Sequence, residues 1–193
     1  MSGARLKLYL IRHPATSVDK RRPPEDWQLS EEGERQLDAL LRCSFWSEVQ
    51  HVYSSAEPKA AAVAERVHSD LGIPLSLHSE LRELKRVGFA HDYAQQVARV
   101  LASPGEEIGG WESLESALGR VWAFLTEVAG RGVLPAAVVS HGIVLSAVRA
   151  RLLGRPLVSP AEWRALPFGG VAQIDAVNWQ LTADFVAPQA RRV

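Results

Sequence analysis

The chain has 193 residues, 47% of them hydrophobic and 23% charged, which is an ordinary composition for a globular protein with one sizeable core. Its 22 basic residues balance 22 acidic residues, so no overall charge attracts it to nucleic acid or to an anionic membrane. We therefore expect a single domain over residues 1–193 with neither kind of partner. The sequence carries no signal for an oligomeric state.

Cysteine usage and the N-terminus predict a soluble cytoplasmic protein. Cys43 is the only cysteine, which excludes an internal disulfide and a multi-cysteine metal site. The first residues, "MSGARLKLYLI", lack the long apolar segment and small-residue cleavage site of a signal peptide. No apolar stretch reaches the roughly 18 residues that would indicate a membrane span.

The first elements in the chain are a strand, a loop and a helix. Residues 6–11, "LKLYLI", form an apolar run of strand length. Residues 14–28 contain three prolines and predict a loop, whose length suggests a functional role. Residues 30–42 have helical spacing, with Ser30 as the expected N-cap.

The rest of the chain alternates between strand and helix patterns. Strands are predicted at residues 49–55, 74–78 and 136–140, and helices at residues 57–72, 91–102, 113–129 and 142–154. Residues 169–186 alternate like two closing strands around Val177 and Asn178. The pattern predicts an α/β fold, a three-layer α/β/α sandwich with a mostly parallel central sheet.

Polar residues stand where three predicted strands end. They are Arg12 with His13, Ser54 with Ser55, and Ser140 with His141. Ligands of such sheets collect beyond the carboxyl ends of the strands. The two histidines and the arginine are therefore candidates for one pocket.

Each histidine also has a structural interpretation. A lone histidine at a strand end is more often a structural hydrogen-bonding group than a catalyst, and we interpret His51, His68, His78 and His91 in this way. The structural interpretation is weaker for His13 and His141, because two separate strands place the same residue type at the same edge.

Five motifs, in order, resemble those of the histidine phosphatase superfamily, which includes the cofactor-dependent phosphoglycerate mutases. "LIRHPAT" is similar to its Arg-His-Gly signature and "VVSHGIVLSAV" to its second histidine motif. Between them, "WQLSEEGERQ" resembles its leucine-serine/threonine-x-x-glycine helix start, "VYSSAEPKAAAVA" its Ser-Ser segment, and "LRELKR" the stretch with its acid. "GGWESLESALGRVWAFL" resembles the segment before its penultimate long helix, so the resemblance covers roughly residues 6–153. The combination of "RHPxT", "SSAExKA" and "GWE" is closest to one branch of the family.

The resemblance implies a phosphoric monoester hydrolase of the histidine acid phosphatase type. In this interpretation His13 is the nucleophile that forms a phosphohistidine, and Glu83 is the general acid and base. Arg12, Lys59 and His141 clamp the negatively charged phosphoryl group. No cofactor or metal is expected, since the site offers one carboxylate rather than a cluster of oxygens. The expected substrate is a small phosphomonoester or a phosphorylated peptide.

Three residues depart from the family pattern. Pro14 replaces the usual glycine, which some branches of the family also do, and Lys59 replaces a commoner arginine, exchanging a bidentate fork for a point charge. Asp19 falls where a phosphate-contacting asparagine is expected, and a carboxylate there would repel phosphate. The loop is expected to diverge at that point, with Thr16 or Ser17 either supplying a hydroxyl to the phosphate or making local loop contacts.

Other loop and helix-start residues have competing interpretations. Residues 20–22 form a basic cluster that is either a solvated loop tip or a lid that meets a second anionic group of the substrate. Trp27 and Trp111 are interpreted as packing residues. Glu57 either faces the pocket beside Lys59 or serves only as a helix-start residue.

Three functions remain open from the sequence. A phosphomonoesterase is the first, and a phosphoglycerate mutase-type phosphoryl transfer uses the same chemistry. The third is a non-catalytic phosphate-ligand or protein-binding module that has kept the pocket. Lys59 favours that third interpretation, whereas the joint presence of Arg12, His13, Glu83 and His141 opposes it, because a binding module needs neither nucleophile nor acid.

Overall fold

A six-stranded sheet is the centre of the fold. The structure is a computed structural model that describes residues 6–87, 90 and 92–188. The strands are β1 (Lys7–Arg12), β2 (His51–Ser55), β3 (Leu75–His78), β4 (Ala136–Ser140), β5 (Val171–Asp175) and β6 (Gln180–Val186). Their order across the sheet is β3-β2-β4-β1-β5-β6. The first four strands pair in parallel and the hairpin of β5 and β6 adds antiparallel strands, which confirms the predicted mostly parallel sheet.

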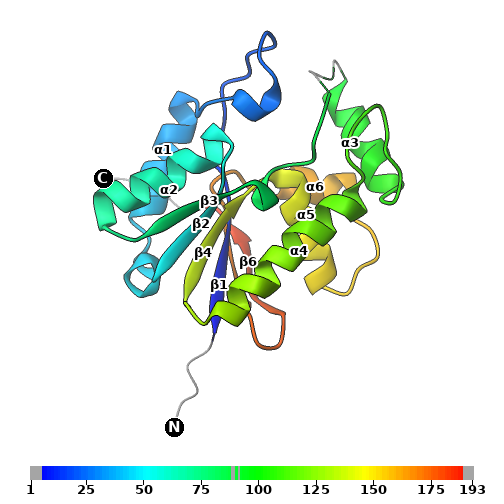
Figure 1. Cartoon of the computed structure of the whole chain (residues 1–193). Coiled ribbons are helices and arrows are strands. Elements are labelled where there is room, and N and C mark those ends of the chain that lie inside the picture. Colours follow the sequence, from blue (N-terminus) through cyan, green and yellow to red (C-terminus); the bar gives the residue numbers. More distant parts are fainter. Residues whose placement is uncertain (1–5, 88–89, 91, 189–193) are drawn as a thin grey trace.

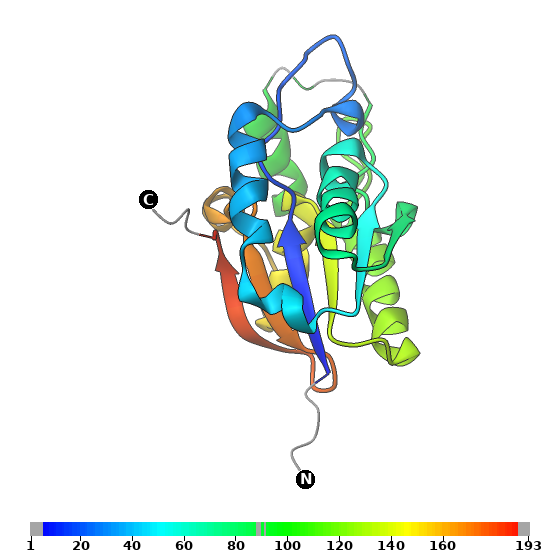
Figure 2. The ribbon, with the colours of Figure 1, turned by 90° about the vertical axis from the view of Figure 1, so that its left-hand side faces the viewer.

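Helices cover both faces of the sheet (Figure 1). They are α1 (Glu31–Leu41), α2 (Pro58–Leu71), α3 (Tyr93–Ala102), α4 (Leu114–Arg131), α5 (Gly142–Leu152) and α6 (Pro160–Ala165). Short 3-10 helices are η1 (Pro24–Asp26), η2 (Ser44–Glu48) and η3 (Ser79–Leu81). Helices α1 and α2 lie on one face, with α4 and α5 on the other (Figure 2). The three-layer α/β/α arrangement is confirmed.

Alternation along β1 divides the core between the two faces. Leu8 and Leu10 pack in the cluster that includes α4 and α5, whereas Tyr9 and Ile11 pack in the cluster that includes α1 and α2. Successive side chains of a strand point to opposite faces, so a continuous apolar run can fill both cores. Burial of each leucine stabilises the fold by about 2 kcal/mol.

The predicted helix boundaries follow from local signals. Ser30 caps α1 by accepting a hydrogen bond from the Gly33 backbone N–H at 3.1 Å, as expected. Helix α2 ends at Gly72, whose φ of 71° lies in the left-handed region that glycine favours. Helix α6 was not predicted, although Ser159 and Glu162 form a capping box that its sequence carries.

None of the helices in the described residues combines the length and the apolar character needed to cross a membrane.

Candidate active site

The carboxyl ends of β1 and β4 bring the two predicted histidines together. Arg12 is opposite Ser140 in the parallel register, and the His13 N–H donates to the Ser140 carbonyl at 3.0 Å. The rings of His13 and His141 then lie with their centroids 5.1 Å apart. A cavity of about 650 Å³ opens at this edge, and all the predicted site residues line it: Arg12, His13, Thr16, Lys59, Glu83 and His141.

His13 is held in one orientation and one tautomer by its own loop. Its Nδ1 lies 2.7 Å from the Pro14 carbonyl oxygen, which can only accept, so Nδ1 carries the proton. The lone pair is therefore on Nε2. Burial, with a smaller contribution from the nearby cations Lys59 and Arg12, lowers the pKa of His13 well below its usual range, so the ring is neutral. A neutral imidazole with its lone pair on Nε2 is a nucleophile.

Arg12 and His141 have buried polar atoms without a protein partner. Arg12 Nε and both ring nitrogens of His141 make no hydrogen bond within the described part of the chain. A buried donor without a partner is costly, so these atoms indicate a bound polar ligand. Gly142 allows the Arg12 guanidinium to lie against the start of α5, because a Cβ at position 142 would be 2.9 Å from Arg12 Cζ. Burial, then Lys59, lowers the pKa of His141, which is therefore neutral and donates one N–H.

The loop after His13 is closed at its base by helix α1. Ser30 N–H donates to the Ala15 carbonyl at 3.0 Å, and Thr16 forms a bridge with Leu29. A Cβ on Gly33 would stand 2.0 Å from the Ala15 oxygen, so only glycine permits this contact. The glycine of the helix-start motif therefore places Thr16 on the cavity wall.

Glu83 is buried at the N-terminus of α5. Its carboxylate accepts backbone hydrogen bonds from Ile143 at 2.9 Å, Val144 at 3.1 Å and Leu84 at 3.2 Å. Burial raises the pKa of Glu83, and the hydrogen bonds to Ile143 and Leu84 and the charge of Arg86 offset part of that rise. A carboxyl group with a raised pKa is suited to give a proton and then to take one.

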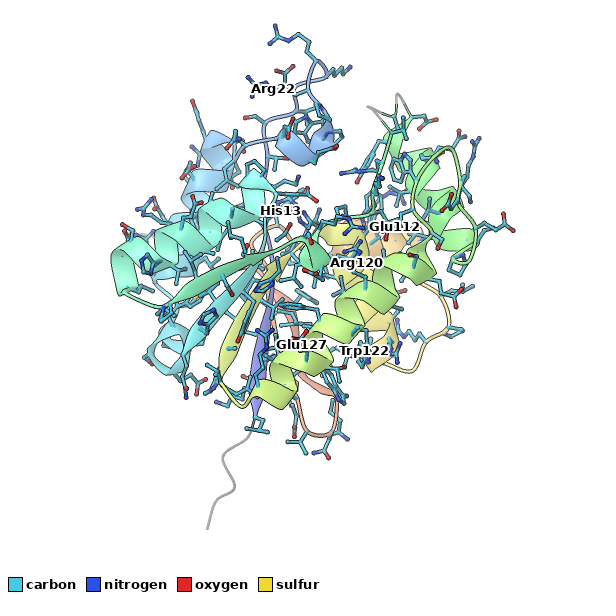
Figure 3. All side chains as sticks on the ribbon, viewed as in Figure 1. His13, Arg22, Glu112, Arg120, Trp122 and Glu127 are labelled. Atoms are coloured by element: carbon cyan, nitrogen blue, oxygen red, sulfur yellow. The ribbon has the colours of Figure 1, made fainter. Side chains whose placement is uncertain are left out.

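A second layer of residues, which the sequence did not reveal, holds the backbone of Glu83. Arg120 of α4 donates to the carbonyls of Glu80 at 2.5 Å, Arg82 at 3.1 Å and Glu83 at 3.4 Å. Glu112 fixes that guanidinium through an ion pair of 2.9 Å. Figure 3 labels Arg120 and Glu112 beside this segment. The glutamate of the "GWE" motif therefore acts through Arg120 on the position of the acid.

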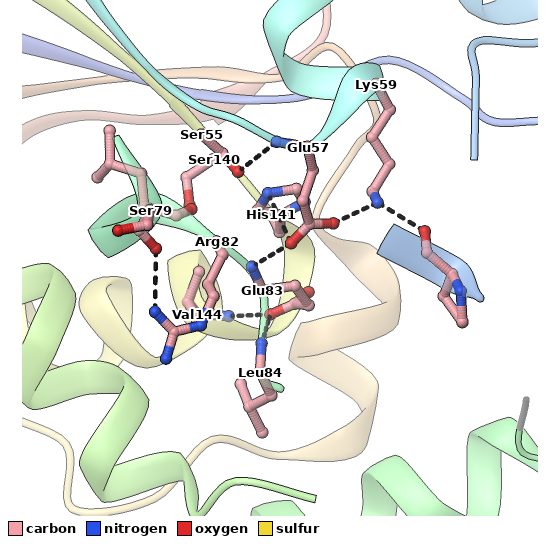
Figure 4. Close-up of polar contacts among 12 residues, drawn as sticks. Ser55, Glu57, Lys59, Ser79, Arg82, Glu83, Leu84, Ser140, His141 and Val144 are labelled. Carbon is pink, nitrogen blue, oxygen red and sulfur yellow. Dashed lines mark hydrogen bonds and ion pairs between the residues drawn. The ribbon is translucent and has the colours of Figure 1, made fainter. Parts of the chain in front are cut away.

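Lys59 reaches the site with Glu57 beside it (Figure 4). The Lys59 ammonium donates to the Pro24 carbonyl at 2.8 Å and forms a short ion pair with the Glu57 carboxylate. An ammonium group has three N–H donors, so one is left for a phosphoryl oxygen. Glu57 stands at the N-cap of α2 without capping it, and accepts instead from the Glu83 N–H at 2.8 Å. Its Oε1 also lies 3.5 Å from His141 Nε2, so helix capping does not explain this residue.

Several other predicted residues lie outside the cavity. Among the described residues, the basic cluster at 20–22 contributes nothing to the cavity wall, and Arg21 and Arg22 pair with Asp19 at 3.1 and 3.9 Å. Figure 3 shows Arg22 at the loop tip, away from His13. Trp111 is buried in the core, as expected, whereas Trp27 is partly exposed and lines the cavity.

The remaining histidines make local contacts. His51 and His78 both bond the Ser76 hydroxyl, at 3.0 and 2.9 Å, and His68 Nδ1 lies 3.0 Å from the Ile73 carbonyl. None of the three lines the cavity. His91 lies outside the described residues. Within the described residues there is also no group of three or more His, Cys, Asp or Glu side chains placed to hold a metal ion.

A second wall of the cavity was not predicted from the sequence. It is lined by residues from the segment after β3, the start of α3, α6 and the loop before β5, namely Arg86, Tyr93, Trp163, Arg164, Leu166, Pro167 and Phe168. Phe168 lies over Arg12, with the guanidinium carbon 3.8 Å from the ring centroid. The capping box of α6 is the one local signal that could have located part of this wall.

Known proteins resemble this chain in fold. A mycobacterial glucosyl-3-phosphoglycerate phosphatase in complex with VO3 is 22% identical, covers 96% of this chain and 100% of its own, and superposes with a TM-score of 0.74. Bacillus stearothermophilus YhfR is 21% identical, with 95% and 98% covered and a TM-score of 0.74. The alpha-ribazole phosphatase of Shigella flexneri is 23% identical, with 97% and 98% covered and a TM-score of 0.70.

No curated protein matches the chain in sequence. The sequence profile of the histidine phosphatase superfamily (branch 1) matches residues 8–182, which include both histidine motifs, all of β5 and the start of β6. The chain belongs to the histidine phosphatase superfamily, branch 1.

Proposed function

We propose that the protein is a metal-independent phosphomonoester hydrolase that acts through a phosphohistidine on His13. The observation that carries this proposal is the setting of His13: Nδ1 is bound to the Pro14 carbonyl, which leaves the lone pair on Nε2. Beside that ring lie Arg12 and His141, and Arg12 Nε and both His141 ring nitrogens make no hydrogen bond within the described residues. A phosphoryl group placed among them would satisfy those atoms and meet the nucleophile.

The first step transfers the phosphoryl group to the protein. His13 Nε2 forms a bond to phosphorus while the bond from phosphorus to the ester oxygen breaks. The departing oxygen takes the proton of Glu83, whose buried carboxyl group favours the protonated form. Arg12, His141 and the remaining N–H of Lys59 bind the phosphoryl oxygens, with Thr16 as a hydroxyl donor on the loop side.

The second step releases phosphate. Glu83, now a carboxylate, takes a proton from water as the water oxygen attacks phosphorus and the bond to Nε2 breaks. Neutral His13 and protonated Glu83 return to their starting states, and inorganic phosphate leaves. Proteins of similar fold are named as phosphatases and include a complex with inorganic phosphate, which supports hydrolysis over mutase chemistry.

The test is to trap the intermediate. The protein is incubated with a reactive phosphomonoester in excess EDTA, quenched without acid and analysed by mass spectrometry, and phosphate is expected on His13. His13→Ala should carry none. His68→Ala is the matched control, because its Nδ1 also bonds a backbone carbonyl, that of Ile73, but the residue does not line the cavity.

Four outcomes would overturn the proposal. Phosphate on another residue, or turnover without label, removes His13 as nucleophile. Loss of turnover in EDTA that magnesium or zinc restores makes the chemistry metal-dependent. Transfer of the label to a second substrate hydroxyl rather than to water makes the protein a mutase. A protein that binds phosphate and cleaves no ester is the binding module.

A further inference from the structure

The cavity is far larger than a phosphoryl group requires. Its volume is about 650 Å³, whereas a phosphoryl group fills the space of two or three waters, roughly 60 to 90 Å³. Cavities of this size in proteins hold whole small molecules, typically of about 300 to 1,000 Å³. Most of the cavity wall therefore faces the leaving group of the substrate, which is the alcohol released when the phosphoryl group is transferred.

The position of Glu83 shows on which side that part lies. A phosphoryl group is transferred in line, so the leaving oxygen stands opposite His13 and next to its proton donor. Arg86 follows Glu83 on the same segment and lines the cavity with it, and its guanidinium lies over the Tyr93 ring. Arg86 and Tyr93 therefore lie beside the proton donor, on the leaving-group side of the cavity.

Four residues form a continuous surface on that side, which we call the leaving-group subsite: Arg86, Tyr93, Trp163 and Arg164. The Arg86 guanidinium lies 5.6 Å from the Tyr93 ring centroid, and the Tyr93 ring meets Trp163 edge-on at 5.9 Å. Arg164 lies 6.0 Å from the Trp163 centroid. The subsite therefore combines two aromatic faces with two guanidinium groups, and all four residues line the cavity.

The two arginines of the subsite have no carboxylate partner among the residues that the structure describes. Nearby arginines differ: Arg82 and Arg120 pair with Glu112, and Arg149 and Arg155 pair with Glu162. Arg12, the third guanidinium of the cavity, also lacks one. These three guanidinium groups, in addition to Lys59, exceed what a single phosphoryl group requires, and such an excess complements a ligand with further negative charge.

We propose that the substrate is a phosphomonoester whose leaving group carries a flat ring and a second anionic group, bound by the leaving-group subsite. This inference rests on the proposed function, because it takes the hydrolysed bond to lie between His13 and Glu83. The ring stacks against Tyr93 and Trp163, and the second anion, a carboxylate or phosphate, meets Arg86 and Arg164. The alternative explanation is that Arg86 and Arg164 only stack on aromatic rings and bind no second anionic group.

The inference is tested with benzyl phosphates and one saturated analogue, all of which release a primary alcohol. Two comparisons are made. The first sets 3- and 4-carboxybenzyl phosphate against the two carbamoylbenzyl phosphates of the same shape, and the second sets benzyl phosphate against cyclohexylmethyl phosphate. We expect kcat/KM for the better carboxylate to exceed that of its carboxamide by about tenfold or more, as for a charge-assisted contact. Benzyl phosphate should exceed cyclohexylmethyl phosphate by about threefold to tenfold, as for a ring contact.

Substitutions in the subsite should remove these preferences selectively. Arg86→Gln and Arg164→Gln should each reduce the preference for carboxylate over carboxamide, and the double variant should abolish it while benzyl phosphate is still hydrolysed. Trp163→Leu should reduce the preference for the flat ring. The matched control is Arg99→Gln, an exposed arginine of α3 outside the cavity, which should leave every ratio unchanged.

Binding of the uncleavable 4-carboxybenzylphosphonate separates this inference from the proposed function. If no ester is cleaved but this probe binds more tightly than its carboxamide, and Arg86→Gln with Arg164→Gln removes the difference, the hydrolase proposal fails and the subsite stands. If esters are cleaved through phosphorylated His13 but carboxylate and carboxamide react equally, the subsite inference is wrong and the hydrolase stands. Equal binding of 4-carboxybenzylphosphonate and its carboxamide also overturns the subsite inference.

Discussion

The two halves of the cavity are made from different kinds of structure. The phosphoryl half uses strand ends and the residues beside them, with Arg12 as the last residue of β1, His13 directly after it and His141 directly after β4. The leaving-group half comes from α6, the start of α3 and the segment before α3. None of these three parts is held in place by a strand of the sheet. Reactive groups need positions fixed to a fraction of an ångström, and a hydrogen-bonded sheet supplies them. A wall that only recognises shape and charge can be built on loops and short helices.

This comparison makes a first prediction, that bond cleavage depends on the strand-end half. His13→Ala should lower kcat/KM by at least about 10⁴-fold, the order seen when a catalytic nucleophile is removed. The fold should survive, since the His13 backbone still donates to Ser140. Steady-state kinetics and circular dichroism measure both. A variant that retained most of its activity would show that the histidine pair is not the reactive centre.

The second prediction concerns Lys59, which is buried and joins the phosphoryl half to the loop through Pro24. Lys59→Ala removes a cation from the transition state, so kcat/KM should fall by roughly 10² to 10³. Lys59→Arg should retain much more activity, because a guanidinium binds a phosphate through two N–H groups. The midpoint of thermal unfolding should be measured for both variants as well, because Glu57 loses its ion-pair partner in the alanine variant and the fold is then less stable. Equal activity of wild type and Lys59→Ala would limit Lys59 to holding the loop.

The two halves also differ in how far the sequence predicts them. Arg12, His13 and His141 could be located because apolar runs predict buried strands, and parallel strands end at one edge. Thr16 and Glu83 came from motif resemblance, and their placement depends on contacts made far along the chain. Gly33 against Ala15 and Arg120 against the carbonyl of Glu83 are such contacts.

The leaving-group half was not predicted, for a physical reason. Trp163 and Arg164 sit on α6, which is only six residues long and gives little periodic signal. Tyr93 faces the cavity because α3 packs against α6, and Arg86 because it contacts the Tyr93 ring, and no local pattern specifies these contacts. The sequence leaves Glu57 open between a pocket residue and a helix-start residue, because its contact with Glu83 joins two segments that a sequence pattern cannot relate.

The third prediction uses Glu83, which lies where the two halves meet. Glu83→Gln removes the proton donor and leaves the cations in place. Hydrolysis of alkyl phosphates should fall by about 10² or more, whereas p-nitrophenyl phosphate, whose phenolate needs little protonation, should be affected far less. Equal losses for both substrates would assign the proton to another group.

The same variant tests the pH dependence of the reaction. The pKa of Glu83 is raised by burial, and the acid form is the one that works, so the rate with an alkyl phosphate should fall as pH rises through that pKa. The pKa of His13 is lowered, so the neutral nucleophile should persist below the usual histidine range and be lost only at lower pH. In Glu83→Gln the decline at high pH should disappear, while the decline at low pH remains.

The smallest effect is expected for Glu57, which touches both Lys59 and Glu83 without lining the cavity. Its negative charge raises the pKa of Glu83 and neutralises part of the positive charge on Lys59. Glu57→Gln keeps an oxygen to accept the Glu83 N–H but removes the charge. Inorganic phosphate should then inhibit more strongly, by roughly threefold to tenfold, because Lys59 is no longer paired.

The decline of the alkyl phosphate rate at high pH should also move to lower pH in this variant, because Glu83 loses a like charge beside it. A purely structural role for Glu57 would reduce the midpoint of thermal unfolding and leave both the pH profile and phosphate inhibition as in wild type. Glu65→Gln, an exposed glutamate on the same helix, is the matched control and should change none of these. If Glu57→Gln matched that control, Glu57 would only help to fold the site, and the proton affinity of Glu83 would be set by burial and Arg86.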